Sequence, residues 1–224
     1  MRQIVSIADL LMIVSQYTDY LQGKISFSSD GWPVLKREWF LNEWPEMMIT
    51  YSNRNNNIVS DRGRTVLCFY SKDKQIYPRF INLYEEIKNY RLFMGVVGPD
   101  ITVTRDMDVE MQKLIMLANQ LFMAILAVNG IKVVLNTRCG MQKTAECFCN
   151  VPKRIMCASG FLGCKNSKNL AEASLYVNKV LSLRPDKLMI YGKQDKKVNE
   201  QLDALGVTYR YYGDFHRLST GRCA

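Results

Sequence analysis

The sequence contains a single histidine, His216, among 224 residues. Hydrolases that depend on a pair of histidines are therefore excluded, and a lone histidine is more often a surface residue than a catalyst. Seven cysteines are present, but Cys147 and Cys149 are separated by one residue where common zinc sites have about two to four, and Cys157 falls in an apolar run typical of a strand. We therefore expect no bound metal and no cofactor.

The sequence also shows little of the pattern expected of a secretory leader, and it has no long uninterrupted apolar run. The opening residues, Met1-Arg2-Gln3-Ile4, are soon followed by Asp9 and Gln16, so they do not form the apolar core of an export signal. The most apolar stretch, 114–128, contains two amides and is too short to cross a hydrocarbon layer. We expect a cytoplasmic protein with reduced thiols and no membrane contact.

The formal net charge is +9, with a pI near 9.2. An excess of Lys and Arg attracts phosphate-bearing polymers and nucleotides, so nucleic acid or a phosphate-bearing small molecule is the expected partner. A rival explanation is compositional, because AT-rich coding sequences enrich Lys and Asn for reasons unrelated to binding. Both explanations stay open at this point.

The first sixty residues differ in pattern from the rest of the chain. Residues 6–22 repeat apolar side chains at helical spacing after a capping-box start, and Gly23 follows them. Residues 24–62 contain two Trp-Pro pairs and an Asn-rich run, which predicts an irregular segment ending in an exposed loop. We therefore expect an N-terminal extension, 1–62, packed on a main domain, 63–224.

From Thr65 onward, short apolar runs alternate with helical patterns. The runs read as six strands, at 66–70, 92–97, 131–135, 155–158, 188–191 and 207–212. Helices are expected near 83–90, 108–128, 142–149, 169–183 and 195–205. Strands that are apolar throughout are buried on both faces, which indicates a parallel sheet of the α/β class. The pattern leaves open whether this sheet is an open three-layer sheet or an incomplete barrel.

In both architectures, ligands bind at the carboxyl ends of the parallel strands. Asp100 follows the second expected strand, and Asn136 and Arg138 follow the third. A carboxylate, an amide and a guanidinium on one edge can bind a phosphate or polarise a carbonyl, so these three are the candidate catalytic residues. Arg105 and Asp106 are candidate ligand-binding residues, although an acidic residue just before a long helix also serves as a cap.

The fourth and fifth strand ends supply the remaining candidates. Ser159, Gly160, Gly163 and Lys165 lie in a loop whose composition suits an anion-binding nest, although a plain turn explains the glycines equally well. The loop does not have the spacing of a Walker motif. Tyr191 and Lys193 at the fifth strand end complete the expected ligand-binding set.

The last expected strand interleaves aromatic and basic residues, as Tyr209-Arg210-Tyr211-Tyr212. This pattern is compatible with stacking on single-stranded nucleic acid. It is equally typical of an amphipathic strand at the edge of a sheet, which is the interpretation that we favour.

Four short segments in this order resemble a known family. They are Gly98-Pro99-Asp100 with Arg105-Asp106, Leu135-Asn136-Thr137-Arg138, Gly160-Phe161-Leu162-Gly163-Cys164, and Ile190-Tyr191-Gly192. Together they look like the uncharacterised bacterial, phage and plasmid proteins of domain of unknown function 4417, over residues 64–215. The resemblance implies a phage or mobile-element context but no reaction. Cys139 stands where we would expect an aromatic residue, which puts a stacking role there in doubt.

Three functions are compatible with these features. The first is binding of nucleic acid or a nucleotide-like phosphate ligand at the strand ends. The second is a hydrolase or transferase acting on nucleotides or nucleic acid through Asp100, Asn136 and Arg138. The third is an accessory or counter-defence protein that docks to a host protein, with Trp32, Trp39 and Trp44 as an anchor surface.

Overall fold

The computed structural model describes residues 6–104, 106–140, 142–160, 180 and 182–220. Seven parallel strands form one sheet, in the order of the sequence. They are β1 (Met47–Thr50), β2 (Thr65–Cys68), β3 (Gly95–Val97), β4 (Val133–Asn136), β5 (Met156–Gly160), β6 (Lys187–Tyr191) and β7 (Tyr209–Tyr212). Each neighbouring pair is parallel, so the predicted α/β class with a parallel sheet is confirmed.

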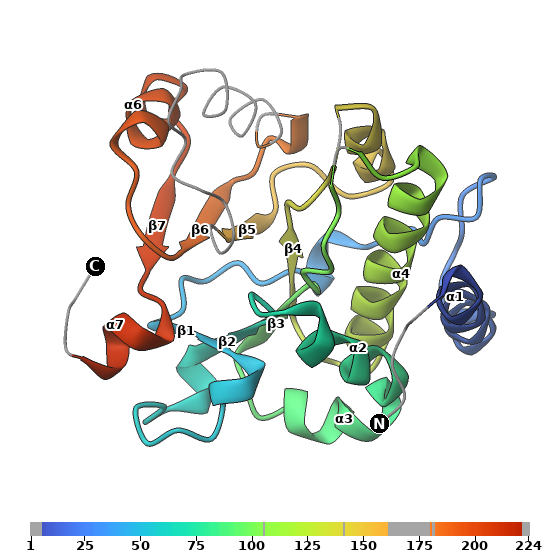
Figure 1. The fold of residues 1–224 in the computed structure, drawn as a ribbon, viewed down its shortest axis with the longest axis horizontal. Coiled ribbons are helices and arrows are strands. Elements are labelled where there is room, and N and C mark those ends of the chain that lie inside the picture. Colours follow the sequence, from blue (N-terminus) through green and yellow to red (C-terminus); the bar gives the residue numbers. More distant parts are fainter. Residues whose placement is uncertain (1–5, 105, 141, 161–179, 181, 221–224) are drawn as a thin grey trace.

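The strand order decides between the two predicted architectures. Every connection moves to the next position in the same direction, and such connections are right-handed, so the crossing segments all lie on one face of the sheet. A three-layer sheet needs helices on both faces and a reversal of strand order. The sheet instead curls into an incomplete barrel, with the helices outside it (Figure 1).

Alternating side chains of the strands divide the core into two clusters. In β2, Leu67 belongs to the larger cluster, which includes the helices, whereas Val66 and Cys68 belong to the smaller one. The smaller cluster draws its strand side chains from the opposite, concave face. The strands β2 to β6 are therefore buried on both faces, as their continuously apolar sequences predicted, whereas β7 is partly exposed, as expected of an edge strand.

The helices surround this sheet. The α-helices are α1 (Ile7–Leu21), α2 (Asp73–Ile81), α3 (Leu83–Tyr90), α4 (Val109–Val128), α6 (Lys196–Ala204) and α7 (Phe215–Ser219). Short 3₁₀ turns are η1 (Arg37–Trp39), η2 (Tyr51–Asn53), η3 (Arg62–Arg64) and η4 (Gln142–Phe148). In Figure 1, α1 lies against the outer side of α4, with which it shares the larger core cluster.

The helix α1 begins as its sequence predicted. Ser6 and Asp9 form a reciprocal capping box, in which the Asp9 amide donates to the Ser6 hydroxyl over 3.2 Å. Tyr17 on its buried face donates a hydrogen bond to the Phe80 carbonyl oxygen over 2.6 Å. This bond ties α1 to the end of α2.

One described helix, α4, is long and apolar enough to cross a membrane. However, 72% of its most apolar window is buried inside the protein. Because most of this stretch is buried, α4 is packed as a core helix.

Several details of the predicted organisation were wrong. The strand count of six missed β1, because Met47–Thr50 is a four-residue strand between a Trp-Pro pair and an Asn-rich loop. The sheet thus begins before residue 63, inside the segment that we expected to be irregular. The helix predicted near 142–149 is the 3₁₀ segment η4, and most of the helix predicted at 169–183 lies outside the described residues.

Candidate functional site

Asp100, Asn136 and Arg138 come together at the carboxyl ends of β3 and β4. Asn136, the last residue of β4, donates from Nδ2 to Asp100 Oδ1 and to the Pro99 carbonyl oxygen, each over 3.0 Å. Its Oδ1 accepts a hydrogen bond of 3.2 Å from the Arg138 backbone amide. Asn136 thus holds the two chain segments that carry the carboxylate and the guanidinium.

The Asp100 and Arg138 side chains form an ion pair of 3.6 Å. Asp100 is buried, whereas the Arg138 side chain is 25% exposed. Burial raises the pKa of Asp100 above its ordinary value, although the charge of Arg138 and the hydrogen bond from Asn136 act in the opposite direction. Asp100 is therefore more basic than a surface aspartate, and the Arg138 side chain is partly open to solvent.

Asp73, at the start of α2, links this cluster to the neighbouring strand end. Its Oδ1 accepts hydrogen bonds from the Thr102 amide, over 3.1 Å, and from the Thr102 hydroxyl, over 3.0 Å. The negative charge of Asp73 also contributes to the raised pKa of Asp100. The ends of β2, β3 and β4 therefore form one connected polar strip.

A small cavity lies between this strip and α4. Its volume is about 10 Å³, and Asn119, Gln120, Asn136 and Arg138 are among its lining residues. Gln120 donates to the Cys147 carbonyl oxygen, but its Oε1 and the Asn119 Oδ1 are buried with no hydrogen-bond partner among the described residues. A cavity of this size holds no more than one water molecule, so it is too small for a substrate.

Gly160 and Tyr191 lie in a packed layer inside the curled sheet, whereas Ser159 is buried on the opposite face of β5, the face of Cys157. Gly160 is opposite Tyr191 in the register of β5 and β6, and the Tyr191 ring stacks on Tyr70 with centroids 5.3 Å apart. A Cβ atom on Gly160 would lie 2.5 Å from the Tyr70 ring. Glycine is therefore needed at this position because an aromatic ring occupies the space of its side chain.

Two further predicted ligand-binding residues, Lys193 and Asp106, have no described contact with the cluster. Lys193 follows β6, is exposed, and makes no described contact with Asp100, Asn136 or Arg138. Asp106 is also exposed, and a hydrogen bond from Thr104 lowers its pKa. Arg105, Gly163 and Lys165 lie outside the described residues.

A second pocket, at the ends of β1 and β2, was missed in the sequence. Its volume is about 210 Å³, and three of its lining residues are the cations Arg54, Lys74 and Arg79. Ser52 after β1 and Ser71 after β2 also line it. We call these five residues and the space between them the basic pocket.

Tyr51 forms the centre of this arrangement. The Arg54 guanidinium carbon lies 3.9 Å from the Tyr51 ring centroid, and that of Arg79 lies 4.6 Å from it. Arg54 also donates to the Tyr51 carbonyl oxygen over 3.0 Å. Both guanidinium groups are therefore held against a fixed ring.

Glu86 of α3 is the carboxylate nearest to these cations in the described contacts. It forms an ion pair with Arg79 and accepts a hydrogen bond from the Tyr51 hydroxyl. Burial together with this bond raises the pKa of Tyr51 to about 12, so Tyr51 stays protonated at neutral pH. The lining residues include three cations and no carboxylate, so the basic pocket carries a positive charge.

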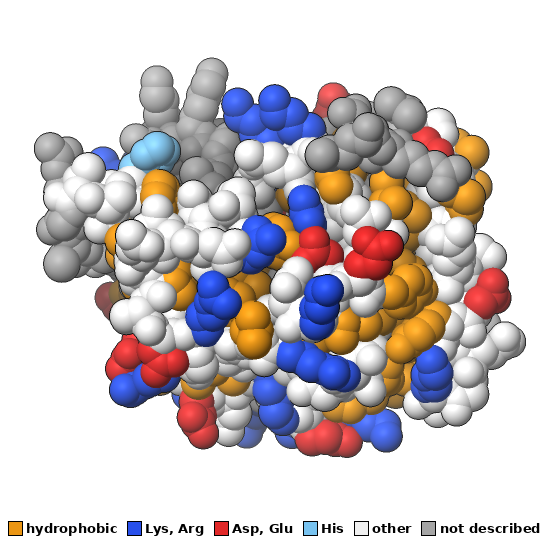
Figure 2. Space-filling view, turned by 90° about the horizontal axis from the view of Figure 1, so that it is seen from below, with side chains coloured by type: hydrophobic (Ala, Val, Ile, Leu, Met, Phe, Trp, Pro, Cys, Tyr) orange, Lys and Arg blue, Asp and Glu red, His pale blue; other side chains and the backbone are white. Residues whose placement is uncertain are grey.

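Lys and Arg side chains are also frequent on the surface around these elements. Figure 2 shows the side of the molecule that is lowest in Figure 1, where α2 and α3 lie, and blue side chains spread across the middle of this face. Acidic side chains are interspersed among them. The net positive charge of the chain is thus partly displayed on this face.

Among the residues that the structure describes, no group of three or more His, Cys, Asp or Glu side chains is placed to hold a metal ion. Cys68, Cys139, Cys147 and Cys157 are buried thiols. Burial raises the pKa of Cys147 to about 11, which makes its thiolate scarce at neutral pH. These four cysteines behave as core residues.

Comparison with known proteins identifies a family but no characterised relative. No curated protein and no solved structure matches the chain significantly. The family model described as Domain of unknown function (DUF4417) matches residues 26–210. The match covers most of the chain and begins before residue 64, so it includes β1, which the motifs alone had not indicated. The chain therefore belongs to the family of the Domain of unknown function (DUF4417).

Proposed function

We propose that this protein binds a phosphate-bearing ligand, a nucleotide or a nucleic acid, at the carboxyl ends of its parallel strands. The observation that carries the proposal is the basic pocket, where Arg54, Lys74 and Arg79 surround about 210 Å³ at the ends of β1 and β2. Ligands of parallel α/β folds bind at this edge.

The pocket suits a phosphate group in its chemistry. Guanidinium groups present several N–H donors in a planar fork that matches phosphate oxygens, and an ammonium group adds a mobile charge. Contact with the Tyr51 ring restricts Arg54 before a ligand arrives, which reduces the entropy lost on binding. The Ser52 and Ser71 hydroxyls offer further donors to phosphate oxygens.

The polar strip beside the pocket supports a ligand larger than a single phosphate. Asp73 directly precedes Lys74 and accepts two hydrogen bonds from Thr102. Two residues before Thr102 stands Asp100, which pairs with the partly exposed Arg138. A bound polyanion extending from Lys74 along the strand ends would thus meet a fourth cation.

Binding measured at increasing salt concentration tests this proposal, and two probes distinguish a nucleic acid from a nucleotide as the ligand. Fluorescence anisotropy would be measured with a labelled 20-nucleotide poly(dT) and with a fluorescent ATP analogue, from 50 to 200 mM NaCl. For single-stranded nucleic acid, each neutralised phosphate contributes about −0.7 to the slope of log K against log salt, so three contacts give a slope near −2. A slope near zero, or no binding of either probe, would remove the basis of the proposal.

Two single substitutions that each reverse one charge test whether binding depends on the basic pocket. Lys74→Glu lies in the basic pocket, whereas Lys196→Glu lies on α6, where the Lys196 side chain is 89% exposed. We expect Lys74→Glu to weaken binding at least about tenfold and Lys196→Glu to weaken it less than about threefold. Equal losses in both variants would indicate attraction to the net charge alone.

A second candidate function is catalysis on such a ligand by the Asp100 cluster. The observation that favours it is a buried carboxylate of raised pKa held between Asn136 and Arg138, which is the environment of a general base. Phosphate release from nucleoside triphosphates and nuclease activity would be assayed for the wild type, for Asp100→Asn and for the exposed control Asp106→Asn. Turnover that survives Asp100→Asn would count against this function.

The setting of this function is also a proposal. The family resemblance implies a phage or mobile element, and the composition suggests a cytoplasmic protein. Trp32 and Trp39 are partly buried against the larger core cluster and Trp44 against the smaller one, so the three tryptophans do not support docking to a host protein through one shared anchor surface.

A further inference from the structure

We infer that the cleft between the first and last strands binds an extended, acidic peptide segment of another protein, which adds to β7 as an eighth parallel strand. The cleft has a volume of about 810 Å³ and is lined by residues around β1 and by all of β7. We call it the seam cleft. It is separate in its lining residues from the basic pocket and does not depend on the proposed function.

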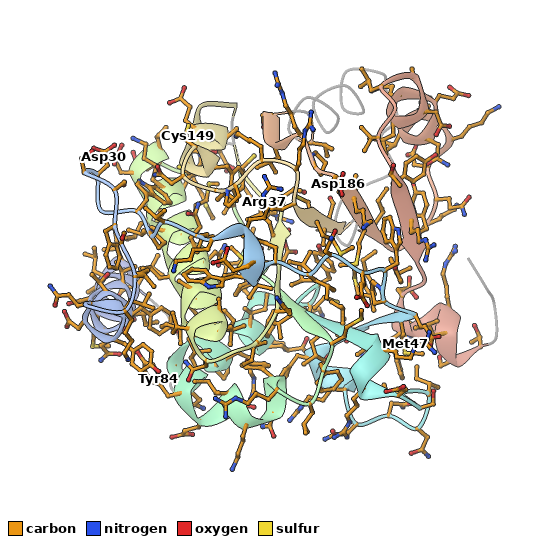
Figure 3. The ribbon with its side chains drawn as sticks, turned by 180° about the vertical axis from the view of Figure 1, so that it is seen from behind. Asp30, Arg37, Met47, Tyr84, Cys149 and Asp186 are labelled. Carbon is orange, nitrogen blue, oxygen red and sulfur yellow. The ribbon has the colours of Figure 1, made fainter. Side chains whose placement is uncertain are left out.

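The seam cleft exists because the curled sheet does not close. β1 pairs only with β2, and β7 pairs only with β6. The start of β1, at Met47, lies beside α7 and the end of β7 in opposite views of the molecule (Figures 1 and 3). The Tyr212 hydroxyl donates to the Pro45 carbonyl oxygen over 3.1 Å. A side chain therefore connects the two edges here. Paired strands, which lie about 4.8 Å apart, would be connected by backbone hydrogen bonds instead.

The edge of β7 presents to the seam cleft backbone groups that pair with no described strand. The Leu188 amide donates to the Thr208 carbonyl oxygen, and the Gly192 amide donates to that of Tyr212. In a parallel ladder, alternate residues point their N–H and C=O groups to opposite edges. The even-numbered residues of β7 therefore face β6, and Tyr209 and Tyr211 direct their backbone groups into the seam cleft.

The number of strands supports an added strand. Closed barrels of parallel strands joined by helical crossovers have eight strands, and this sheet has seven in the same sequential order. An eighth strand would lie between the two edges of the sheet, β7 and β1. A peptide in this position would receive backbone hydrogen bonds from an existing edge, which is the mode of recognition called strand addition.

The side chains of the seam cleft favour an acidic peptide. Arg64 is paired with Glu46 over 2.7 Å. Arg210 lies with its guanidinium carbon 4.8 Å from the Trp44 ring centroid, and it has no acidic partner within ion-pair distance among the described residues. A carboxylate of the incoming strand can pair with Arg210, while apolar side chains contact Met47 and Leu218.

Stacking of nucleic acid bases fits the seam cleft less well than a peptide. Arg210 lies over the Trp44 ring. The Tyr209 hydroxyl donates to Asp203 over 2.9 Å and the Tyr211 hydroxyl donates to Asn199 over 2.6 Å, so both rings are tied to α6. Arg210 therefore covers one face of Trp44, and the Tyr209 and Tyr211 rings pack against the larger core cluster with their hydroxyls bonded, so none of the three is a free stacking platform.

Selection from a displayed library of random 12-residue peptides tests the inference. Enriched peptides would be synthesised in three forms: unmodified, N-methylated at alternate residues, and with each acidic residue replaced by its amide. We expect acidic sequences to be enriched, and N-methylation of one alternate set to weaken binding at least about tenfold, because each methyl group removes a backbone donor. The amide form should bind at least about threefold more weakly.

The location would be checked on the full chain. Arg210→Glu should reduce peptide affinity at least about tenfold, whereas Lys196→Glu should leave it within about twofold. In hydrogen exchange, the Tyr209 and Tyr211 amides should gain protection on adding peptide, because only these amides of β7 face the seam cleft. The inference is overturned if no peptide is enriched, if both N-methylated sets bind like the parent, or if (dT)₁₂ protects these amides and peptides do not.

Discussion

The fit of Gly160 against Tyr70 makes a quantitative prediction about stability. A Cβ atom on Gly160 would lie 2.5 Å from one atom of the Tyr70 ring and 2.8 and 2.9 Å from two others. These distances are shorter than any relaxed carbon contact, and Tyr70 is itself buried and stacked on Tyr191. The ring therefore cannot move without disturbing the layer of aromatic side chains inside the sheet.

Overpacking of this kind typically costs about 1–3 kcal/mol. For a chain of 224 residues, each kcal/mol lowers the melting temperature by roughly 2–4 °C, so Gly160→Ala should lower it by about 2–12 °C. Gly213→Ala is the matched control, because its Cβ would meet neighbouring atoms at 3.6 Å or more. We expect the control to stay within about 0.5 kcal/mol of the wild type.

A double substitution separates this clash from other effects of alanine. Tyr70→Leu removes the ring that the new Cβ would meet, so Gly160→Ala should cost clearly less in the Tyr70→Leu background than in the wild type. Chemical denaturation of the four proteins gives the coupling energy, which we expect to be at least about 1 kcal/mol. Additive effects, or a Gly160→Ala variant as stable as the wild type, would show that the two residues do not pack as described.

Further predictions concern the Asp100 cluster. Asn136→Leu removes the donor to Asp100 and to the Pro99 carbonyl oxygen, and leaving buried acceptors unpaired should cost about 2–4 kcal/mol in chemical denaturation; a loss below 0.5 kcal/mol would contradict this bonding. The raised pKa of Asp100 means that the folded protein binds this proton more tightly than the unfolded chain does. Its contribution to stability is therefore present below the ordinary pKa and is lost as the pH rises through the folded pKa. Between pH 4 and 7, stability should thus fall more steeply in the wild type than in Asp100→Asn, and identical pH profiles would refute the effect.

The strands show what was predictable from the sequence. The runs that became β2 to β6 are apolar throughout, and burial on both faces follows from that pattern whichever way the sheet closes. Closure itself depends on strand order and twist, which no local pattern encodes. β1 was not predicted because it has only four residues, which are too few to show a strand pattern, and because it directly follows a Trp-Pro pair typical of irregular segments.

The site was predictable where the strand-end rule and the strand order coincide. Asp100 and Asn136 follow neighbouring strands, so the rule placed them together correctly. Lys193 follows β6, which is two strands away from β4, or roughly 9–10 Å in the hydrogen-bonding direction. Its separation from the cluster is thus a consequence of sheet order.

The basic pocket was missed for a local reason. Arg54 lies in an Asn-rich loop after the undetected β1, and Lys74 and Arg79 belong to α2, whose helical pattern is interrupted by Pro78. Three cations just beyond two successive strands were a usable signal, but only once both strands were recognised.

The central claim, that a phosphate-bearing ligand binds at the carboxyl ends of the strands, is tested most directly by the footprint of a bound polyanion. Amide hydrogen exchange would be compared with and without (dT)₁₂ at low salt. We predict increased protection in residues 51–54 and 71–79, which carry the three cations of the basic pocket. Protection confined to other segments, with these two unchanged, would contradict the claim.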